Sequence, residues 1–102
     1  MSDVPMQRTE GDEVPDHDAP PGAFCWRTEP PDDTTPGGRY LLYVCPRGAG
    51  FCGVPIRPNV LPNGAGWNHD GNDDAPTLTP SVNCVGGCGW HGFITNGRMT
   101  GV

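Results

Sequence analysis

The sequence predicts a small all-β domain, a zinc-stabilised meander of short strands and hairpins, preceded by a disordered N-terminal leader. Three observations lead to this fold class. Only 34% of the residues are hydrophobic, and the chain contains 16 glycines and 13 prolines, so little apolar material is available for a core. No long window keeps a helical period, whereas short runs rich in β-branched and aromatic residues recur between turn residues. Four of the five cysteines lie in the C-terminal part of the chain, where a bound metal would supply the missing stability.

The first 36 residues differ in composition from the rest of the chain. They contain seven prolines, nine acidic residues and two arginines, for a net charge of −7, whereas residues 37–102 carry a net charge of +1. Such a segment buries too little apolar surface to offset the entropy lost on ordering. We therefore predict a disordered leader over residues 1–36 and a folded domain over residues 37–102. The apolar island Phe24-Cys25-Trp26 either docks onto this domain or is a stray group in the leader.

Three extended segments follow in the predicted domain. Residues 39–45 combine Tyr, Leu and Val and predict the first strand. Residues 54–57 predict a short return strand, and Pro55 restricts it to the edge of a sheet because proline cannot donate to a ladder. Residues 77–82 also look extended, with Pro80 limiting them to an edge or a bend.

The clearest local signal is a hairpin near the C-terminus. Residues 93–95 and 98–100 flank Asn96-Gly97, a pair that tolerates the positive φ angles of a type I′ turn. With this hairpin, we expect about five or six short strands in all.

Charge and hydropathy exclude two classes of partner. The domain has no basic face that could release counterions from a phosphate backbone, so we expect no nucleic-acid binding. No run approaches the ~18 apolar residues of a membrane span, and the N-terminus lacks a signal-peptide pattern. We therefore expect a cytoplasmic protein that does not bind membranes.

The cysteines fall into two pairs. Cys45 and Cys52 form the first pair, and Cys84 and Cys88 form the second, with two glycines between its members. Zn²⁺ prefers four tetrahedral thiolate or imidazole ligands, commonly supplied by two such pairs, so these four residues are the candidate ligands. Two alternatives remain open: buried structural thiols, or disulfides, which a reducing compartment disfavours. Cys25 lies outside both pairs and is expected to be a free thiol.

His91 has two possible roles. Its spacing from Cys88 suits a zinc ligand, in which case it would replace one of the cysteines. If the four cysteines saturate the metal, the imidazole is free for proton transfer. A catalytic zinc with an open coordination position is least favoured, because it would need histidine or carboxylate ligands and a nearby acidic base.

Several of these residues together resemble a known family. The features are Cys45-Pro46, Cys52, Trp67, the segment Pro76–Ser81 (PTLTPS) and the segment Cys88–Gly97 (CGWHGFITNG). This pattern, over roughly residues 39–100, resembles the domain-of-unknown-function family 6527 of bacteriophages and bacterial operons. The resemblance implies a small zinc-binding protein, located in the host cytoplasm if it is phage-encoded. Some relatives lie beside ubiquitin-like conjugation genes and are thought to be serine-dependent peptidases.

Carried over to this chain, the resemblance implies that Ser81 is a nucleophile and His91 its general base. A carboxylate from Asp70, Asp73 or Asp74 could orient the imidazole, and the sequence does not choose among them. The first cysteine pair is more widely spaced than the compact Cys-Pro-x-Cys form of the family.

Two functions of different classes follow from the sequence. The first is a small zinc-binding accessory protein of a phage or bacterium, a metal-stabilised protein-interaction module. In this module zinc supplies folding free energy and no chemistry. The alternative is a serine-dependent peptidase with a Ser81–His91 pair on the same scaffold. The expected partner is a protein or a peptide substrate in either case, and whether the protein is an enzyme stays open at this stage.

Overall fold

The fold is built almost entirely of short strands. The computed structural model describes residues 3–16, 18–33, 37–46, 50–61, 64–84 and 89–101. Over these residues the strands are β1 (Asp3–Pro5), β2 (Gln7–Arg8), β3 (Ala23–Glu29), β4 (Gly38–Val44), β5 (Phe51–Pro55), β6 (Asn68–His69), β7 (Leu78–Asn83), β8 (His91–Thr95) and β9 (Arg98–Gly101). One 3₁₀ turn, η1 (Glu10–Asp12), is the sole helical element of the described residues, and none of their helices could cross a membrane. The prediction of a small all-β protein is confirmed.

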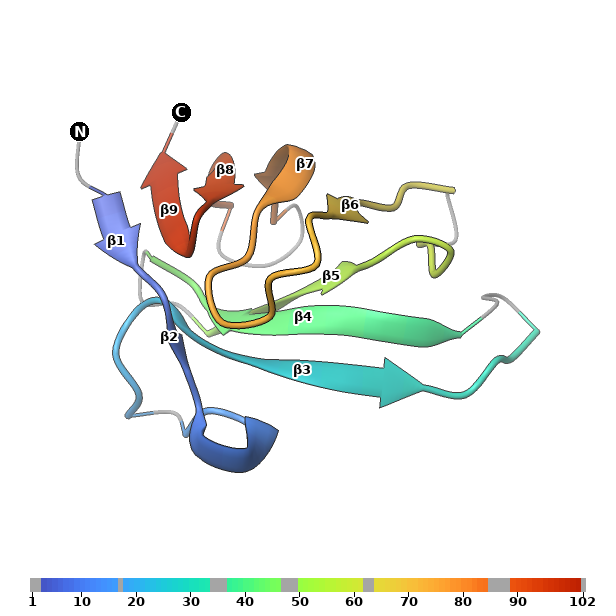
Figure 1. Cartoon of the computed structure of the whole chain (residues 1–102), viewed down its shortest axis with the longest axis horizontal. Helices are drawn as coiled ribbons and strands as arrows, with labels where there is room; N and C mark the ends of the chain where they lie inside the picture. Colours follow the sequence, from blue (N-terminus) through green and yellow to red (C-terminus); the bar gives the residue numbers. More distant parts are fainter. Residues whose placement is uncertain are drawn as a thin grey trace.

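The strands form two sheets that lie one above the other (Figure 1). One sheet has the order β1-β9-β8-β7-β6, and the other has the order β2-β3-β4-β5. A single apolar cluster joins them, with Phe24 and Leu41 from the four-stranded sheet and Ile94 and Met99 from the five-stranded sheet. The core therefore lies between the two sheets, and each sheet keeps one face toward solvent.

The N-terminal strand passes from one sheet to the other. β1 pairs with β9 in the five-stranded sheet, and β2 pairs with β3 in the four-stranded sheet. Met6, the one residue between β1 and β2, is buried, and its backbone N–H donates to the carbonyl oxygen of Gly97 at 2.8 Å. This short crossing fastens the two sheets together at one side of the molecule.

Residues 3–16 and 18–33 contain regular structure, although the sequence predicts disorder over residues 1–36. These residues supply β1, β2 and β3, and the island Phe24-Cys25-Trp26 lies inside β3 with Phe24 and Cys25 fully buried. β3 pairs with β4 over the register from Phe24↔Tyr43 to Glu29↔Gly38, so the predicted leader and the predicted domain share one sheet. This segment joins the sheet because its apolar island buries surface against β4, which the proline- and acid-rich flanks cannot do.

Several local predictions are confirmed. β4 matches the first predicted strand except at Cys45, and β5 is an edge strand as predicted, although it spans Phe51–Pro55 rather than residues 54–57. The predicted hairpin is β8–β9, and its turn residues Asn96 and Gly97 have φ angles of 50° and 71°. The described residues form nine strands rather than five or six, because the N-terminal segment contributes three of them.

Gly92 allows the close packing of β8 against β9 and is the basis of a stability prediction. A Cβ at this position would overlap the carbonyl oxygen of Thr100 and would lie 2.5 Å from the ring of Trp90. We expect Gly92→Ala to lower the free energy of unfolding by ~1–3 kcal/mol, because overpacking forces neighbouring atoms to move. Urea denaturation followed by tryptophan fluorescence measures this loss.

The matched control for this prediction is Gly53→Ala. Gly53 also lies in a strand, and a Cβ there would meet the Tyr40 ring at an ordinary contact distance of 3.5 Å. Equal unfolding midpoints for the two variants would contradict the packing argument.

Candidate active site

Ser81 and His91 lie side by side on neighbouring strands. Ser81 belongs to β7, and His91 is the first residue of β8. The Ser81 Oγ lies 3.1 Å from the His91 Nε2, which is a hydrogen-bonding distance. When the imidazole carries its proton on Nδ1, the serine hydroxyl donates to Nε2. The pair therefore has the geometry in which a base can accept the proton of a nucleophile.

The strand register explains this contact. Val82 pairs with Gly92, and Asn83 pairs with His91. Because side chains alternate between the faces of a strand, Ser81 and Asn83 share a face, and His91 lies on that face directly opposite Asn83. Ser81 therefore reaches His91 along a diagonal of the antiparallel pair, on the face directed away from the buried Val82.

An irregularity in β7 precedes Ser81. Leu78 pairs with Ile94 and Val82 pairs with Gly92, so four steps along β7 match only two steps along β8. Pro80 lies in this stretch and has no N–H to donate to the ladder. Bulges of this kind redirect side chains, and Ser81 lies within the shifted stretch between Leu78 and Val82. The sequence predicts that Pro80 limits this segment to an edge or a bend, and of these the bend is observed, because β7 lies between β8 and β6 in the sheet.

Trp67 holds the backbone of Ser81. Its indole Nε1 donates to the carbonyl oxygen of Ser81 at 3.0 Å. Its own backbone N–H donates to the carbonyl oxygen of Pro55 at 3.1 Å, next to the bridge between Ile56 and Trp67. Trp67 thus links the end of β5 to the candidate nucleophile. Sequence reasoning assigned no role to this residue, although a tryptophan with its polar N–H is a natural choice for such a link.

Two of the three candidate orienting carboxylates form salt bridges elsewhere. Asp73 Oδ2 lies 3.2 Å from a guanidinium nitrogen of Arg39. Asp74 Oδ1 lies 3.0 Å from a guanidinium nitrogen of Arg8. Neither side chain has a hydrogen bond to His91 in the described part of the chain.

The third carboxylate, Asp70, organises its own loop. Its Oδ1 accepts the backbone N–H of Asn72 at 3.0 Å and that of Thr77 at 3.3 Å. The hydrogen bond from Asn72 is the main cause that lowers the pKa of Asp70 below its ordinary value. Among the described residues, Ser81 is the sole hydrogen-bond partner of the His91 ring. The structure therefore brings together a pair, Ser81 and His91, without an aspartate.

Two of the four candidate zinc ligands are bonded to each other. Cys52 of β5 and Cys84, which directly follows β7, are joined in a disulfide with a Cα–Cα distance of 6.2 Å. Cys45 is also disulfide-bonded, Cys25 is a buried free thiol, and Cys88 lies outside the described residues. One member of each predicted pair is thus brought into contact. Groups of three ligands able to hold a metal are absent from the described residues, a search that does not include Cys88.

The described cysteines of the predicted zinc site offer sulfur, which is the ligand atom that structural zinc sites commonly use. Structural zinc sites use thiolates, and Cys45, Cys52 and Cys84 all offer sulfur at buried or partly buried positions. In the structure the sulfurs of Cys52 and Cys84 are bonded to each other, so they could bind a metal only after reduction. Cys45 is disulfide-bonded as well, so all three described candidate ligands would need reduction before they could bind zinc.

A cavity of about 290 Å³ lies between β5 and the end of β7. Its described lining includes Tyr43, Val54, Val82 and the disulfide-bonded Cys52 and Cys84, and none of the described lining residues is charged. Neither Ser81 nor His91 lines it. The cavity is therefore on the Val82 side of β7, opposite the face that carries the Ser81 hydroxyl.

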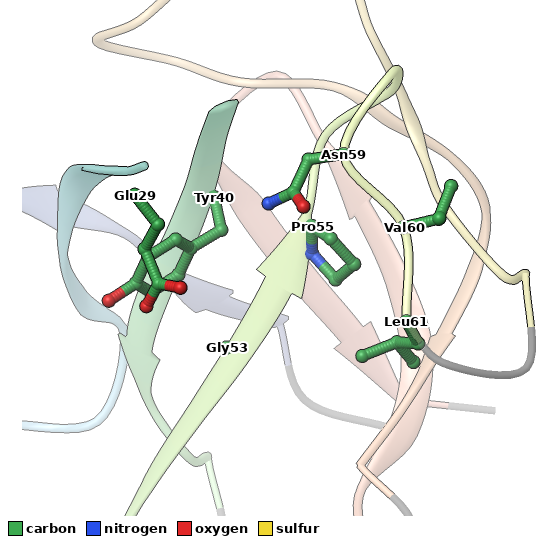
Figure 2. Close-up of a pocket in the computed structure, with 7 residues that line it drawn as sticks. All are labelled: Glu29, Tyr40, Gly53, Pro55, Asn59, Val60 and Leu61. Carbon is green, nitrogen blue, oxygen red and sulfur yellow. The ribbon is translucent and has the colours of Figure 1, made fainter. Parts of the chain in front are cut away.

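A second cavity, of about 210 Å³, lies farther along β5. Figure 2 shows Glu29 and Tyr40 together on one wall, with Val60 and Leu61 on the loop that forms the other. Its lining includes neither Ser81 nor His91. Leu61 borders both cavities, and the described lining of neither contains Ser81 or His91.

Comparison with known proteins identifies the family. Residues 11–102 match the family described as "Bacterial ubiquitination-like system serine protease (BubE)". The chain belongs to the BubE family. The match supports this name and not the number 6527, and it begins within the N-terminal segment that also supplies β3. No curated protein and no solved structure matches the chain.

Proposed function

We propose that the protein is a serine-dependent peptidase in which Ser81 is the nucleophile and His91 the general base. The observation that carries this proposal is the 3.1 Å distance between Ser81 Oγ and His91 Nε2. The description of the BubE family as a serine protease supports it. A hydroxyl becomes an effective nucleophile when a base within hydrogen-bond reach accepts its proton.

The reaction follows from the positions of these two groups. Ser81 Oγ attacks the carbonyl carbon of the scissile peptide bond while its proton passes to His91 Nε2. The C–N bond then breaks, the imidazolium returns the proton to the leaving amine, and an acyl ester remains on Ser81. Water, deprotonated by the same imidazole, hydrolyses this ester and restores the free serine. No carboxylate of the described residues takes part.

The substrate is proposed to be a protein or a peptide. The family description places BubE proteins in a bacterial ubiquitination-like system, in which substrates and partners are proteins. The exposed face of β7 and β8 supports this class, because His91 is accessible to a chain approaching from solvent.

A zinc-stabilised interaction module is the competing function that the sequence favours first. It gives Ser81 and His91 no common task, so their contact would be incidental. The hydrogen-bonding distance, the position of Ser81 within the bulged stretch of β7 and the family description all favour the peptidase.

We also propose that zinc is the structural cofactor of the reduced protein, with Cys45, Cys52, Cys84 and Cys88 as ligands. Support comes from the contact between Cys52 and Cys84, one from each pair. The reducing cytoplasm expected from the sequence would reduce the disulfides, so that the thiolates could bind a metal. His91 would then remain outside the zinc site and available as a base.

Labelling with a fluorophosphonate probe tests the peptidase proposal. The chain contains only two serines, Ser2 and Ser81, so the labelled residue is identified without ambiguity by peptide mass spectrometry. We expect stoichiometric labelling of Ser81 and its loss in Ser81→Ala. Thr79→Ala, which removes an exposed hydroxyl from the same strand, is the matched control and should label normally. A wild-type protein that does not react would overturn the proposal.

A further inference from the structure

We propose that Phe93 is a substrate-binding residue of the proposed peptidase, and that its ring contacts an apolar side chain of the substrate. This side chain belongs to the acyl residue, the one whose carbonyl carbon Ser81 attacks. The inference rests on the proposed function, because it names a specificity-determining contact for the Ser81–His91 pair. Phe93 contacts the substrate and takes no part in proton transfer.

Phe93 lies on the same face of the sheet as the candidate catalytic pair. Exposed and buried residues alternate along β8, so His91 and Phe93 both point to solvent while their neighbours in the strand are buried. Ser81 Oγ reaches the His91 ring on this face at 3.1 Å. The three side chains therefore share the face of the five-stranded sheet that is directed away from the four-stranded sheet (Figure 1).

The strand register places Phe93 opposite the stretch that contains Ser81. Phe93 is the one β8 residue between the pairs formed by Gly92 and by Ile94, so it faces residues 79–81 of β7. Opposed residues on one face of an antiparallel pair have Cβ atoms about 4.5–5.5 Å apart, within reach of an aromatic ring. An acyl group bonded to Ser81 Oγ therefore has its side chain next to the ring of Phe93.

Phe93 is unusually exposed for an apolar residue of its sheet. Its exposed fraction is 51%, and the other large hydrophobic residues exposed in the described structure, Val14, Phe51 and Leu61, lie outside the five-stranded sheet. Single exposed apolar residues are common on protein surfaces, so exposure alone assigns no role. The position beside the candidate nucleophile does, because a substrate bound there removes apolar ring surface from water.

The surroundings of Phe93 favour an apolar side chain over a charged one. Histidines apart, the five strands of this sheet contain two charged residues, Asp3 and Arg98. These two form a salt bridge of 3.4 Å, and Asp3 also accepts the hydroxyl of Thr100, which pairs with Phe93 on β9. A carboxylate on the ring would therefore lose hydration without meeting an unpaired positive charge on these strands.

An aromatic side chain gains most from this contact, since aromatic pairs add stabilisation to that of the area they bury. A cation can also stack on an aromatic ring. Apolar packing and cation stacking predict opposite preferences between phenylalanine and lysine in the substrate. The proposal commits to apolar packing, and the lysine preference is an outcome that overturns it.

The test compares covalent probes that differ in one side chain. They are N-acetyl α-aminophosphonate diphenyl esters with the side chain of Phe, Ala, Glu or Lys, and Ser81 Oγ displaces a phenoxide from their phosphorus. Intact-mass spectrometry of the full-length wild-type protein gives the second-order rate constant for each probe. We expect the Phe probe to react about tenfold faster than the other three, a factor that matches one aromatic contact. A Lys or Glu probe that reacts as fast as the Phe probe would overturn the inference.

Phe93→Thr removes the ring and keeps a β-branched residue suited to a strand. It should slow the Phe probe about tenfold and leave the Ala probe unchanged, whereas a general disturbance of the sheet would slow both alike. Phe93→Tyr keeps the ring and should keep the preference. Phe51→Thr, the same change at an exposed phenylalanine of β5, is the matched control and should behave as the wild type.

Phe93→Lys gives a readout that a purely structural role cannot produce, and it also decides the question if Phe93→Thr does not fold. The added ammonium should speed the Glu probe about two- to fivefold, the effect of one exposed ion pair, while the Phe probe slows. Equal changes in the rates of both probes would contradict a direct contact with the substrate.

A fluorophosphonate without an amino-acid side chain separates this inference from the proposed function. It should label Ser81 equally fast in the wild type and in Phe93→Thr. If it labels Ser81 but the four phosphonates react at equal rates, or if Phe93→Thr keeps the preference for the Phe probe, the Phe93 contact is rejected and the peptidase stands. If no reagent labels Ser81 in the wild type, the peptidase is rejected and the contact with it.

Discussion

Replacing His91 with alanine is expected to lower the kcat of peptide hydrolysis by about 10⁴- to 10⁶-fold, the range found when the base of a serine–histidine pair is removed. The loss follows from the 3.1 Å contact, because no other described group lies in position to accept the Ser81 proton. His91→Gln should be almost as inactive, since an amide can preserve a hydrogen bond but cannot accept a proton near neutral pH. Cleavage of an internally quenched peptide under single-turnover conditions measures the effect.

Asn83→Ala is the matched control for His91→Ala. Asn83 pairs with His91 in the β7–β8 register and is exposed on the same face. It should retain kcat within about tenfold of the wild type, because it neither bonds nor protonates Ser81. If His91→Ala kept more than a tenth of the wild-type kcat, the imidazole would not be the general base, and the peptidase mechanism proposed here would fail.

The second large effect concerns stability. Cys52 and Cys84 close a loop with a sequence separation of 32 residues. In the chain-entropy description, losing a cross-link of this span costs about 4 kcal/mol. Cys52→Ser should therefore lower the free energy of unfolding of the oxidised protein by that amount, which is a large part of the stability of a small domain. Urea denaturation of the oxidised variant and wild type gives the difference.

The same substitution tests the zinc proposal under reducing conditions. Reduced wild-type protein should bind one equivalent of Zn²⁺, measured by elemental analysis, and should lose stability when a chelator is added. Cys52→Ser should bind zinc much more weakly. Cys25→Ala removes a buried thiol that belongs to neither pair and should keep full zinc content. Reduced wild-type protein that purifies without zinc and does not respond to added metal would contradict the proposal.

Sequence reasoning succeeded where the signal was local. The β8–β9 hairpin follows from Asn96 and Gly97, whose positive φ angles a type I′ turn requires. β4 follows from a continuous apolar run, and the edge position of β5 follows from Pro55. In each case a few adjacent residues contain the physical cause, so no distant contact has to be known.

The parts that could not be predicted depend on distant contacts. The acidic, proline-rich composition around β3 hides the seven-residue strand, which is stabilised by its partner β4. The hydrogen bond from Trp67 to Ser81 joins residues that are 14 positions apart, and Ser81 lies in the irregular stretch of β7. Likewise, the burial of the Tyr43 hydroxyl without a hydrogen-bond partner among the described residues becomes visible only when both sheets are in place. None of these features leaves a periodic pattern in the chain.

The crossing at Met6 has a consequence for the order in which the protein can fold. β1 pairs with β9, so the first and last strands of the described chain are neighbours, and the Met6 N–H is satisfied only by the carbonyl of Gly97. Such non-local pairing gives a high contact order, which slows folding. During synthesis, the pairing of β1 cannot form before β9 has left the ribosome, and the β7–β8 pair that holds Ser81 and His91 cannot form before β8 has left it. A nascent chain is therefore without its proposed catalytic pair until β8 has emerged.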